Sequence, residues 1–403
     1  MKKLIFLLIL IAGLGQTIAQ KAKVQSASNY IKPQYNELDK AKVAIDQAVE
    51  HPSTSNWDKT YYVRGRVYIL LFETKNKKFQ ALSDNPLEES YLAFKKTLEL
   101  DAKARYKDDV VAIMPGLSSH FYNNGVLNFE KGDSEKKQNK IAESIESFRN
   151  SVKSFEYCLE INEMPFVAKI DTSCMFNAAL SADRGKLHDK ALKYYNIVAN
   201  MGYDGDGNGG ANLYFYMSNI HQIKGDTLES VKTLKQGIEA YPEDNIQLIN
   251  HLINYYLGAD KIDEAFTYVQ MAVNKDPGNK SLHFALGHLF DKKGDYEKSI
   301  AAYEEAINID PEYTDALFNY GIVTFNKAVS EHDKANLIED NAEYEKARDD
   351  ANEYFKKALP YLEKAHELES KDFNTLDALA VIYYRLQMMD KREIILKKIE
   401  ELK

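Results

Sequence analysis

One stretch of the sequence has the residue spacing of a cation site. Asp204, Asp206 and Asn208 alternate with glycines, and the pattern D-x-D-x-N-G matches the first half of a calcium-binding loop. A twelve-residue loop counted from Asp204 would end at Phe215, where calcium needs a bidentate glutamate. A plain turn whose glycines supply positive φ accounts for the same residues. The sequence therefore predicts no metal site, and calcium stays open only as the alternative.

Residue patterns typical of catalysis are absent from the rest of the chain. The nine histidines form no H-x-x-x-H or H-E-x-x-H pair, and His283 and His288 lie five residues apart, on different faces of any helix. His366 is followed by Glu367, but no second histidine completes a zinc motif. No G-x-S-x-G motif, phosphate-binding glycine loop or dinucleotide fingerprint occurs. We therefore expect a protein without enzymatic activity and without a cofactor.

The composition favours a folded helical protein. Of the 403 residues, 44% are hydrophobic and 28% are charged, with a net charge of −9. An acidic chain argues against a broad nucleic-acid footprint or a polybasic membrane patch. Nine prolines and nineteen glycines are few for a fold rich in turns, and two cysteines exclude a disulfide-dense scaffold.

The first residues have the pattern of an export signal. Lys2 and Lys3 precede a short apolar run over residues 4–14, and residues 17–19 form a small-residue cleavage site. The run is too short to cross a bilayer, which takes about 20 residues. We expect a signal peptide over 1–19, cleavage near Ala19 and a periplasmic or secreted protein without a transmembrane segment. An uncleaved anchor is the alternative.

A repeat of about 34 residues organises the remaining chain. Pro242, Pro277 and Pro311 follow amphipathic runs at spacings of 35 and 34 residues. The clearest copy is SLHFALGHLFDKKGDYEKSIAAYEEAINIDP, residues 281–311. Its recurring small and large positions are Leu286, Gly287, Phe290, Gly294, Tyr303 and Ala306. This pattern resembles the tetratricopeptide repeat, a helix–turn–helix unit that stacks on its neighbours.

The resemblance implies an all-α fold, a right-handed superhelical solenoid. About eight helix pairs are expected between Trp57 and Lys403, after an N-terminal helical segment at 24–50 that is broken near Pro33. We expect irregular repeats with insertions over 20–201, a glycine-rich joint at 202–210, and a regular solenoid over 211–403. The last part would include an enlarged repeat at 314–371 and a C-terminal capping helix.

Three repeats carry extra residues between their helices. The insertions lie near 72–87, 131–142 and 327–352. Residues 331–350 hold eight acidic and three basic side chains. They predict either a longer pair of solvated helices or a protruding acidic contact site.

The resemblance also implies a binding surface, the concave face lined by the first helix of each pair. The side chains expected in this groove are Tyr62, Tyr122, Phe176, Phe215, Asn219, Asn250, Asn254, Phe284, His288 and Phe318, with Asp377 at the last equivalent position. Aromatic rings offer contact area, and asparagine amides can bond a peptide backbone. Such residues also recur in these repeats without any ligand. We expect the phenylalanines to face outward from the packing seam.

The two cysteines fall at neighbouring helix ends in this repeat scheme. Cys158 lies about one turn before the end of a second helix, and Cys174 lies about one turn into the next first helix. Antiparallel neighbours would bring them together, and export would permit a disulfide between them. Two separately buried thiols are the alternative, and the sequence indicates no reactive cysteine.

Together these features predict a non-catalytic exported scaffold that binds a protein or peptide in its concave groove. The alternatives are a structural or self-associating subunit of a cell-envelope complex and an envelope glycan-binding accessory protein. The groove lacks Lys and Arg at these positions, which argues against capture of a C-terminal carboxylate.

Overall fold

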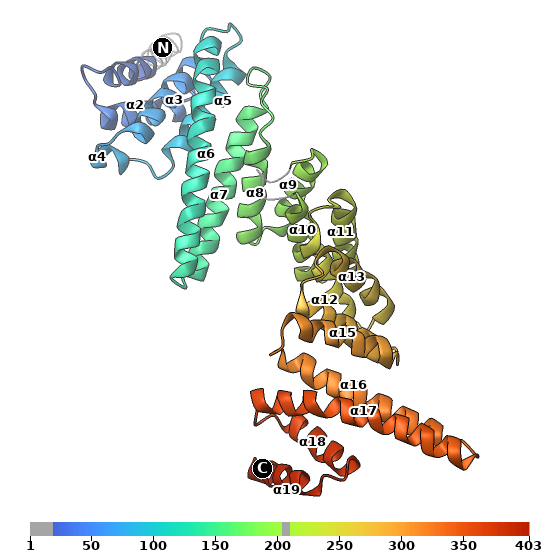
Figure 1. Ribbon diagram of the computed structural model, residues 1–403. Coiled ribbons are helices and arrows are strands. Elements are labelled where there is room, and N and C mark those ends of the chain that lie inside the picture. The colour runs from blue at the N-terminus through green and yellow to red at the C-terminus, as the bar shows by residue number, and fades with distance from the viewer. Residues whose placement is uncertain (1–18, 204–209, 403) are drawn as a thin grey trace, which may run out of the picture. The chain divides into compact units, whose positions relative to one another are not determined.

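The computed structural model describes residues 19–203 and 210–402, and every regular element in these ranges is an α-helix (Figure 1). The expected signal peptide, apart from Ala19, and the calcium-like residues Asp204, Asp206 and Asn208 lie outside the described residues. None of the described helices is long and apolar enough to span a bilayer. The chain divides into two compact units, residues 1–210 and 211–403.

The first unit begins with a helical hairpin made by residues 19–30 and α2 (Leu38–Glu50). The turn between these two helices contains Pro33, at the expected break. The helices that follow are α3 (Asp58–Glu73), the short α4 (Lys77–Gln80), α5 (Pro86–Leu100), α6 (Lys107–Lys137), α7 (Ile141–Asn162), α8 (Thr172–Arg184) and α9 (His188–Asn200).

The second unit opens with helices of nearly uniform length, 13 residues in each first helix and 14 in each second helix. They are α10 (Ala211–Ile223), α11 (Thr227–Ala240), α12 (Ile246–Gly258), α13 (Ile262–Lys275), α14 (Lys280–Lys292) and α15 (Tyr296–Ile309). The remaining helices are α16 (Thr314–Ala335), α17 (Asn341–Leu368), α18 (Phe373–Arg385) and α19 (Met389–Glu401). Pro242, Pro277 and Pro311 each lie two residues beyond the end of a second helix. Proline is common just after helix ends because it lacks the N–H group that a helix interior requires.

Helices pack mainly against their neighbours in sequence, as a stack of helix pairs requires. The pairs of the first unit are α3 with α5, α6 with α7, and α8 with α9. Those of the second unit are α10 with α11, α12 with α13, α14 with α15, α16 with α17, and α18 with α19. The predicted all-α architecture of about eight helix pairs is confirmed in the described chain.

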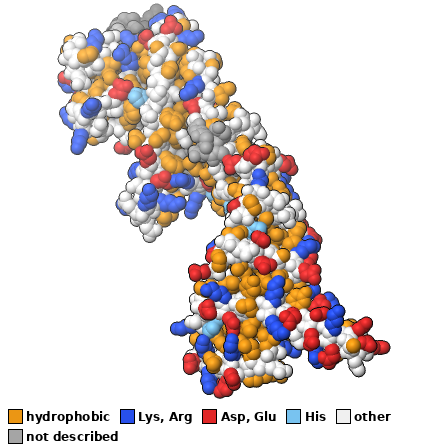
Figure 2. Space-filling view, in the orientation of Figure 1, with side chains coloured by type: hydrophobic (Ala, Val, Ile, Leu, Met, Phe, Trp, Pro, Cys, Tyr) orange, Lys and Arg blue, Asp and Glu red, His pale blue; other side chains and the backbone are white. Residues whose placement is uncertain are grey.

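Two of the insertions lengthen helices. α6 and α7 contain 31 and 22 residues, and α16 and α17 contain 22 and 28 (Figure 1). The predicted acidic segment forms the far end of the α16–α17 hairpin, where Figure 2 shows acidic side chains along the projection. Leu337 stands in the turn between the two helices and is 82% exposed.

Several helix pairs cross at a glycine that receives both a ring and a hydroxyl group. On α14, a Cβ at Gly287 would lie 2.8 Å from two ring carbons of Tyr303, so only glycine admits this ring at this distance. Ser299, four residues before Tyr303, donates its hydroxyl to the Gly287 carbonyl at 2.7 Å. Each second helix at such a crossing thus supplies a serine and, one turn later, an aromatic ring.

The same arrangement recurs in the first unit. The glycine, serine and ring sets are Gly65 with Ser90 and Phe94, Gly125 with Ser151 and Phe155, and Gly132 with Ser144 and Phe148. The last two sets share α6 and α7 and are seven residues apart, so the elongated pair is joined at two successive crossings. These crossings fix which face of each first helix is buried.

A buried cation attaches the N-terminal hairpin to the first repeat. The guanidinium of Arg64 on α3 donates to Asp46 on α2 at 2.8 Å and to Glu89 on α5 at 2.7 Å. Its side chain is 16% exposed, so both contacts are partly shielded from water. One side chain thereby ties three helices together.

Candidate partner-binding site

The groove positions expected in the first unit lie on the first helices but are half-buried. Tyr62 on α3 stacks on Tyr106 with ring centroids 4.4 Å apart. Its hydroxyl donates to Asp109 at 2.8 Å, which connects it to the start of α6. Phe176 on α8 packs against Tyr195 and Tyr203, with centroids 6.3 and 5.5 Å away. These rings are engaged mainly with neighbouring helices.

Tyr122 on α6 borders a hollow of about 360 Å³. Its hydroxyl accepts a hydrogen bond from the Asn177 side chain on α8 at 3.1 Å, and its ring meets Phe155 edge-on. The hollow is lined by Ser118, Ser119, Tyr122, Asn123, Cys158, Lys169, Asp171 and Ser173. The structure thus places one expected groove residue at a concave site.

The groove phenylalanines of the second unit are half-buried, which corrects the expectation that they face outward. Phe284 on α14 contacts Tyr303 and Tyr313, with ring centroids 5.5 and 5.4 Å away. The ring centroid of Phe215 on α10 lies 4.5 Å from that of His251 on α12. Phe318 on α16 packs on the core shared by α16 to α19. The rings fill space between first helices and their neighbours, so removing one would disturb the fold.

Among the asparagine and histidine side chains of the groove, the two on α12 are the most open to solvent. Asn250 and Asn254 are both exposed and lie four residues apart, on one face of the helix. The equivalent positions on neighbouring first helices, Asn219 and His288, are half-buried, and Asp377 on α18 is exposed. Burial lowers the pKa of His251, which adjoins Asn250, and so favours the neutral form of its ring. Asn250 and Asn254 therefore form a short strip of uncharged amides, the α12 strip, and the neighbouring His251 contacts the ring of Phe215.

Both cysteines are buried free thiols on adjoining helices. Cys158 lies near the end of α7, and Cys174 lies in the first turn of α8, as expected. The two thiols are close enough for each to shift the pKa of the other. The disulfide between them stays a prediction.

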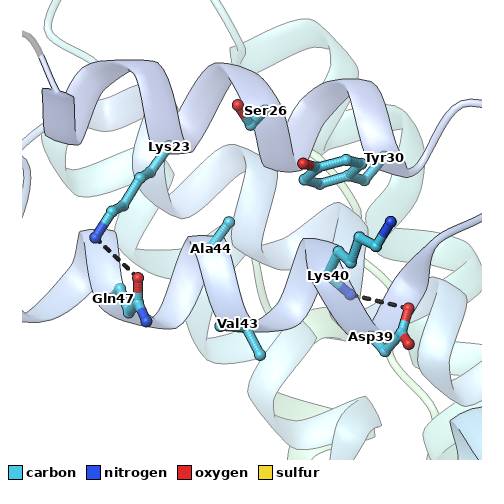
Figure 3. A pocket seen from close by; sticks show the side chains of 8 residues that line it. All are labelled: Lys23, Ser26, Tyr30, Asp39, Lys40, Val43, Ala44 and Gln47. Atoms are coloured by element: carbon cyan, nitrogen blue, oxygen red, sulfur yellow. Dashed lines mark hydrogen bonds between the residues drawn. The ribbon is translucent and has the colours of Figure 1, made fainter.

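Two further hollows lie in the first unit, and their charged groups are largely satisfied. One, of about 450 Å³, lies between the helices of the N-terminal hairpin (Figure 3). There Lys23 donates to Gln47 across the hairpin at 2.8 Å. In the other, of about 340 Å³, Glu88 accepts hydrogen bonds from Lys153 and Tyr157, both at 2.7 Å. These bonds lower the pKa of Glu88, although burial acts to raise it.

Across residues 19–203 and 210–402, no three His, Cys, Asp or Glu side chains converge as a metal site requires. Asp204, Asp206 and Asn208, the residues with calcium-like spacing, lie outside the residues that the structure describes. The described surface offers amides, rings and a hydroxyl-lined hollow, which are groups suited to binding.

Comparison with known proteins supports the repeat resemblance. The sequence model of a family described as TPR repeat matches residues 287–327, from α14 into α16. The BBSome complex member bbs-4 of Caenorhabditis elegans is 22% identical over 334 residues, covering 80% of this chain and 65% of that protein. The TPR repeat-containing protein YpiA of Bacillus subtilis is 28% identical over 169 residues, 39% of each chain.

Solved structures of similar proteins include the C-terminal part of a TPR repeat-containing protein from Cytophaga hutchinsonii. It is 16% identical, covers 68% of this chain and 95% of its own, and superposes with a TM-score of 0.46. The present chain spans only 39% to 65% of the length of the curated relatives it matches.

Proposed function

We propose that this protein is a non-catalytic scaffold that binds a protein or peptide partner along the first helices of its second unit. The observation that carries the proposal is the pair of exposed amides on α12, Asn250 and Asn254. A primary amide both donates and accepts hydrogen bonds, so two amides one turn apart can pair with the backbone of an extended peptide in either direction. The adjacent half-buried ring of Phe215 would supply an apolar edge.

We further propose that the protein acts outside the cytoplasm, in the periplasm or as a secreted protein. The charged start, short apolar run and small residues over 1–19 support export. Protein isolated from its native host should have a mass that begins near Gln20. An intact Met1 start in a soluble cytoplasmic fraction would contradict export and would leave the binding proposal standing.

The binding proposal is tested by removing the amides without disturbing the core. Asn250→Ala/Asn254→Ala should weaken capture of the partner from envelope extract. Two lost hydrogen bonds of about 0.5–1.5 kcal/mol each correspond to roughly 5- to 150-fold in affinity.

The matched control removes two exposed amides from second helices, in Gln236→Ala/Asn274→Ala on α11 and α13. Both variants should keep the helical circular dichroism of the parent protein. The proposal predicts that the α12 variant loses the partner and that the control retains it. Equal recovery by both variants would exclude the α12 strip as the main contact.

A second candidate function is self-association into a structural assembly. It is favoured by the apolar side chains that the last helix presents to solvent, because Ile394 on α19 is 57% exposed and Leu396 is 38% exposed. Light scattering should then show a dimer or larger species that Ile394→Lys dissociates. A monomer at all concentrations would reject this alternative.

A further inference from the structure

The only two cysteines of the chain are held together in the interior of the first unit. Cys158 is 2% exposed and Cys174 is fully buried. The Cys174 thiol lies 3.7 Å from the Phe155 carbonyl, one turn before Cys158 on α7, and it is close enough to the Cys158 thiol for each to shift the pKa of the other. The two thiols therefore adjoin where α7 packs on α8.

The two thiols differ in their access to solvent. Cys158 forms part of the wall of the hollow of about 360 Å³ next to Tyr122, whereas Cys174 is absent from that wall. A small reagent that enters the hollow therefore meets the Cys158 sulfur first. Cys174 lies behind it.

Polar groups around Cys158 are arranged to stabilise its thiolate. The Asn162 amide donates to the Cys158 sulfur at 3.6 Å, and the Ser118 hydroxyl, 3.3 Å from the same sulfur, orients that amide by donating to its oxygen. Interaction with the Cys174 thiol lowers the pKa of Cys158 although burial acts to raise it, and the same interaction together with burial raises the pKa of Cys174. The ammonium group of Lys169, paired with Asp171 at 2.8 Å, also lines the hollow. Because the thiolate is the reactive form, Cys158 is the better nucleophile of the two.

We propose that Cys158 and Cys174 form an ordered thiol pair, in which Cys158 attacks a small disulfide in the hollow and Cys174 resolves the adduct. In the first step the Cys158 thiolate forms a bond to one reagent sulfur. The reagent's S–S bond breaks, and the departing thiolate takes up a proton. In the second step Cys174 loses its proton and attacks the Cys158 sulfur, which releases the other half of the reagent as a thiol. The protein ends with one disulfide, and the reagent is reduced to two thiols.

Oxidation of this pair would alter the wall of the hollow. A disulfide removes the thiol proton of Cys158 and so changes its contacts with Ser118 and Asn162, which are themselves joined by a hydrogen bond of 2.7 Å. The Asn162 amide also donates to the Asp171 carboxylate at 3.4 Å. That carboxylate caps the first turn of α8 by accepting from the backbone N–H of Cys174. The state of the thiol pair is thus coupled to side chains that line the hollow beside Tyr122.

The test uses the reduced, folded full-length chain and cystamine as the small disulfide. The parent protein should lose two hydrogen atoms by intact mass and carry no adduct. Cys174→Ser should retain one cysteamine group on Cys158, because no thiol remains to displace it. Cys158→Ser should stay unmodified when folded and become labelled at Cys174 in urea, which shows that its thiol is intact but sheltered.

Circular dichroism of both serine variants provides the check on folding. Labelling of Cys174 in folded Cys158→Ser, at the rate seen for Cys158 in the other variant, would overturn the assigned order. Two cysteamine groups on the parent protein, or no reaction of any folded form, would overturn the pair itself. These results do not depend on the α12 strip, so they leave the proposed binding function untouched.

Discussion

The glycine crossing between α14 and α15 gives a direct test of the packing. Gly287→Ala adds one methyl group at a place where its carbon would lie 2.8 Å from Cδ1 and Cε1 of Tyr303. Carbon atoms in contact prefer about 3.5–4.0 Å, so the ring or the helix must retreat by roughly 0.7–1.2 Å. Tyr303 is fully buried and cannot swing into solvent. The strain must therefore be absorbed by the core.

Two opposing contributions set the size of the effect. Overpacking of this kind costs about 1–3 kcal/mol. Alanine in place of glycine within a helix adds about 0.8–1.0 kcal/mol to the free energy of unfolding. We therefore expect Gly287→Ala to lower the free energy of unfolding by about 1 kcal/mol, and by at most about 2 kcal/mol.

Gly258→Ala is the matched control, because Gly258 ends the first helix α12 and nothing lies within 4 Å of its added methyl group. This variant should be as stable as the parent protein or slightly more stable. Urea titration followed by helical circular dichroism measures both variants, and amide exchange in α14 and α15 locates the loss. Equal midpoints for the two variants would refute the close approach of Gly287 to Tyr303.

Three further predictions concern other contacts. Ala306→Leu should cost about 1–3 kcal/mol in the same urea titration, because the alanine is fully buried at a helix crossing; an unchanged midpoint would contradict the repeat register. Burial acts to raise the pKa of Glu363, but hydrogen bonds from Lys391 and Tyr383 outweigh it and lower the pKa. The ionised Glu363 carboxylate therefore stabilises the fold above its unfolded-state pKa near 4.5, and this stabilisation is lost as the pH falls through its lower folded-state pKa. Acid should consequently lower the free energy of unfolding more in the parent protein than in Glu363→Gln. Arg64→Leu should cost roughly 1–3 kcal/mol and open the N-terminal hairpin to proteases first, because Asp46 and Glu89 both lose the guanidinium that joins them, although Asp46 keeps Lys42 and Tyr68; uniform cleavage along the chain would argue against this tie.

The helix pairs could be predicted from the sequence because their determinants are local. The prolines at 242, 277 and 311 mark where second helices end, and small residues at a fixed period mark where helices cross. Residues 24–50 likewise form helices on either side of Pro33, as the pattern indicated. For the acidic insertion, a longer pair of solvated helices was one of the two structures that the sequence predicted, and α16 and α17 are lengthened there.

The orientation of side chains could not be predicted in the same way. Phe284 occupies a position that faces the groove in the repeat pattern, but Tyr303 and Tyr313 close around its ring. The contact depends on residues 19 and 29 positions away, which no local period reports. The hollow beside Cys158 escaped prediction for the same reason, because α6, α7 and the start of α8 each supply part of its wall.

One signal in the sequence was available and was missed. Serine four residues before an aromatic ring recurs in second helices, as in Ser299 and Tyr303, and each serine of this kind bonds the carbonyl of a facing glycine. A search for this spacing together with a glycine in the preceding helix would have identified the crossings of the irregular first unit. It would also have distinguished the second-helix rings that pack on a glycine, Phe94, Phe148, Phe155 and Tyr303, from rings at other positions.

That distinction decides where recognition should be sought. Glycine, serine and ring positions are fixed by the crossing, and the groove phenylalanines are engaged with their neighbours, so a ligand cannot gain their full surface without disrupting a repeat. The amides of Asn250 and Asn254 have no such structural role, since they are exposed on a helix whose opposite face carries the core residues Leu248, Leu252 and Tyr256. Changing them costs the fold little, and their bonding capacity is available to a partner. The separation of packing residues from exposed amides therefore favours α12, rather than the aromatic column, as the primary contact.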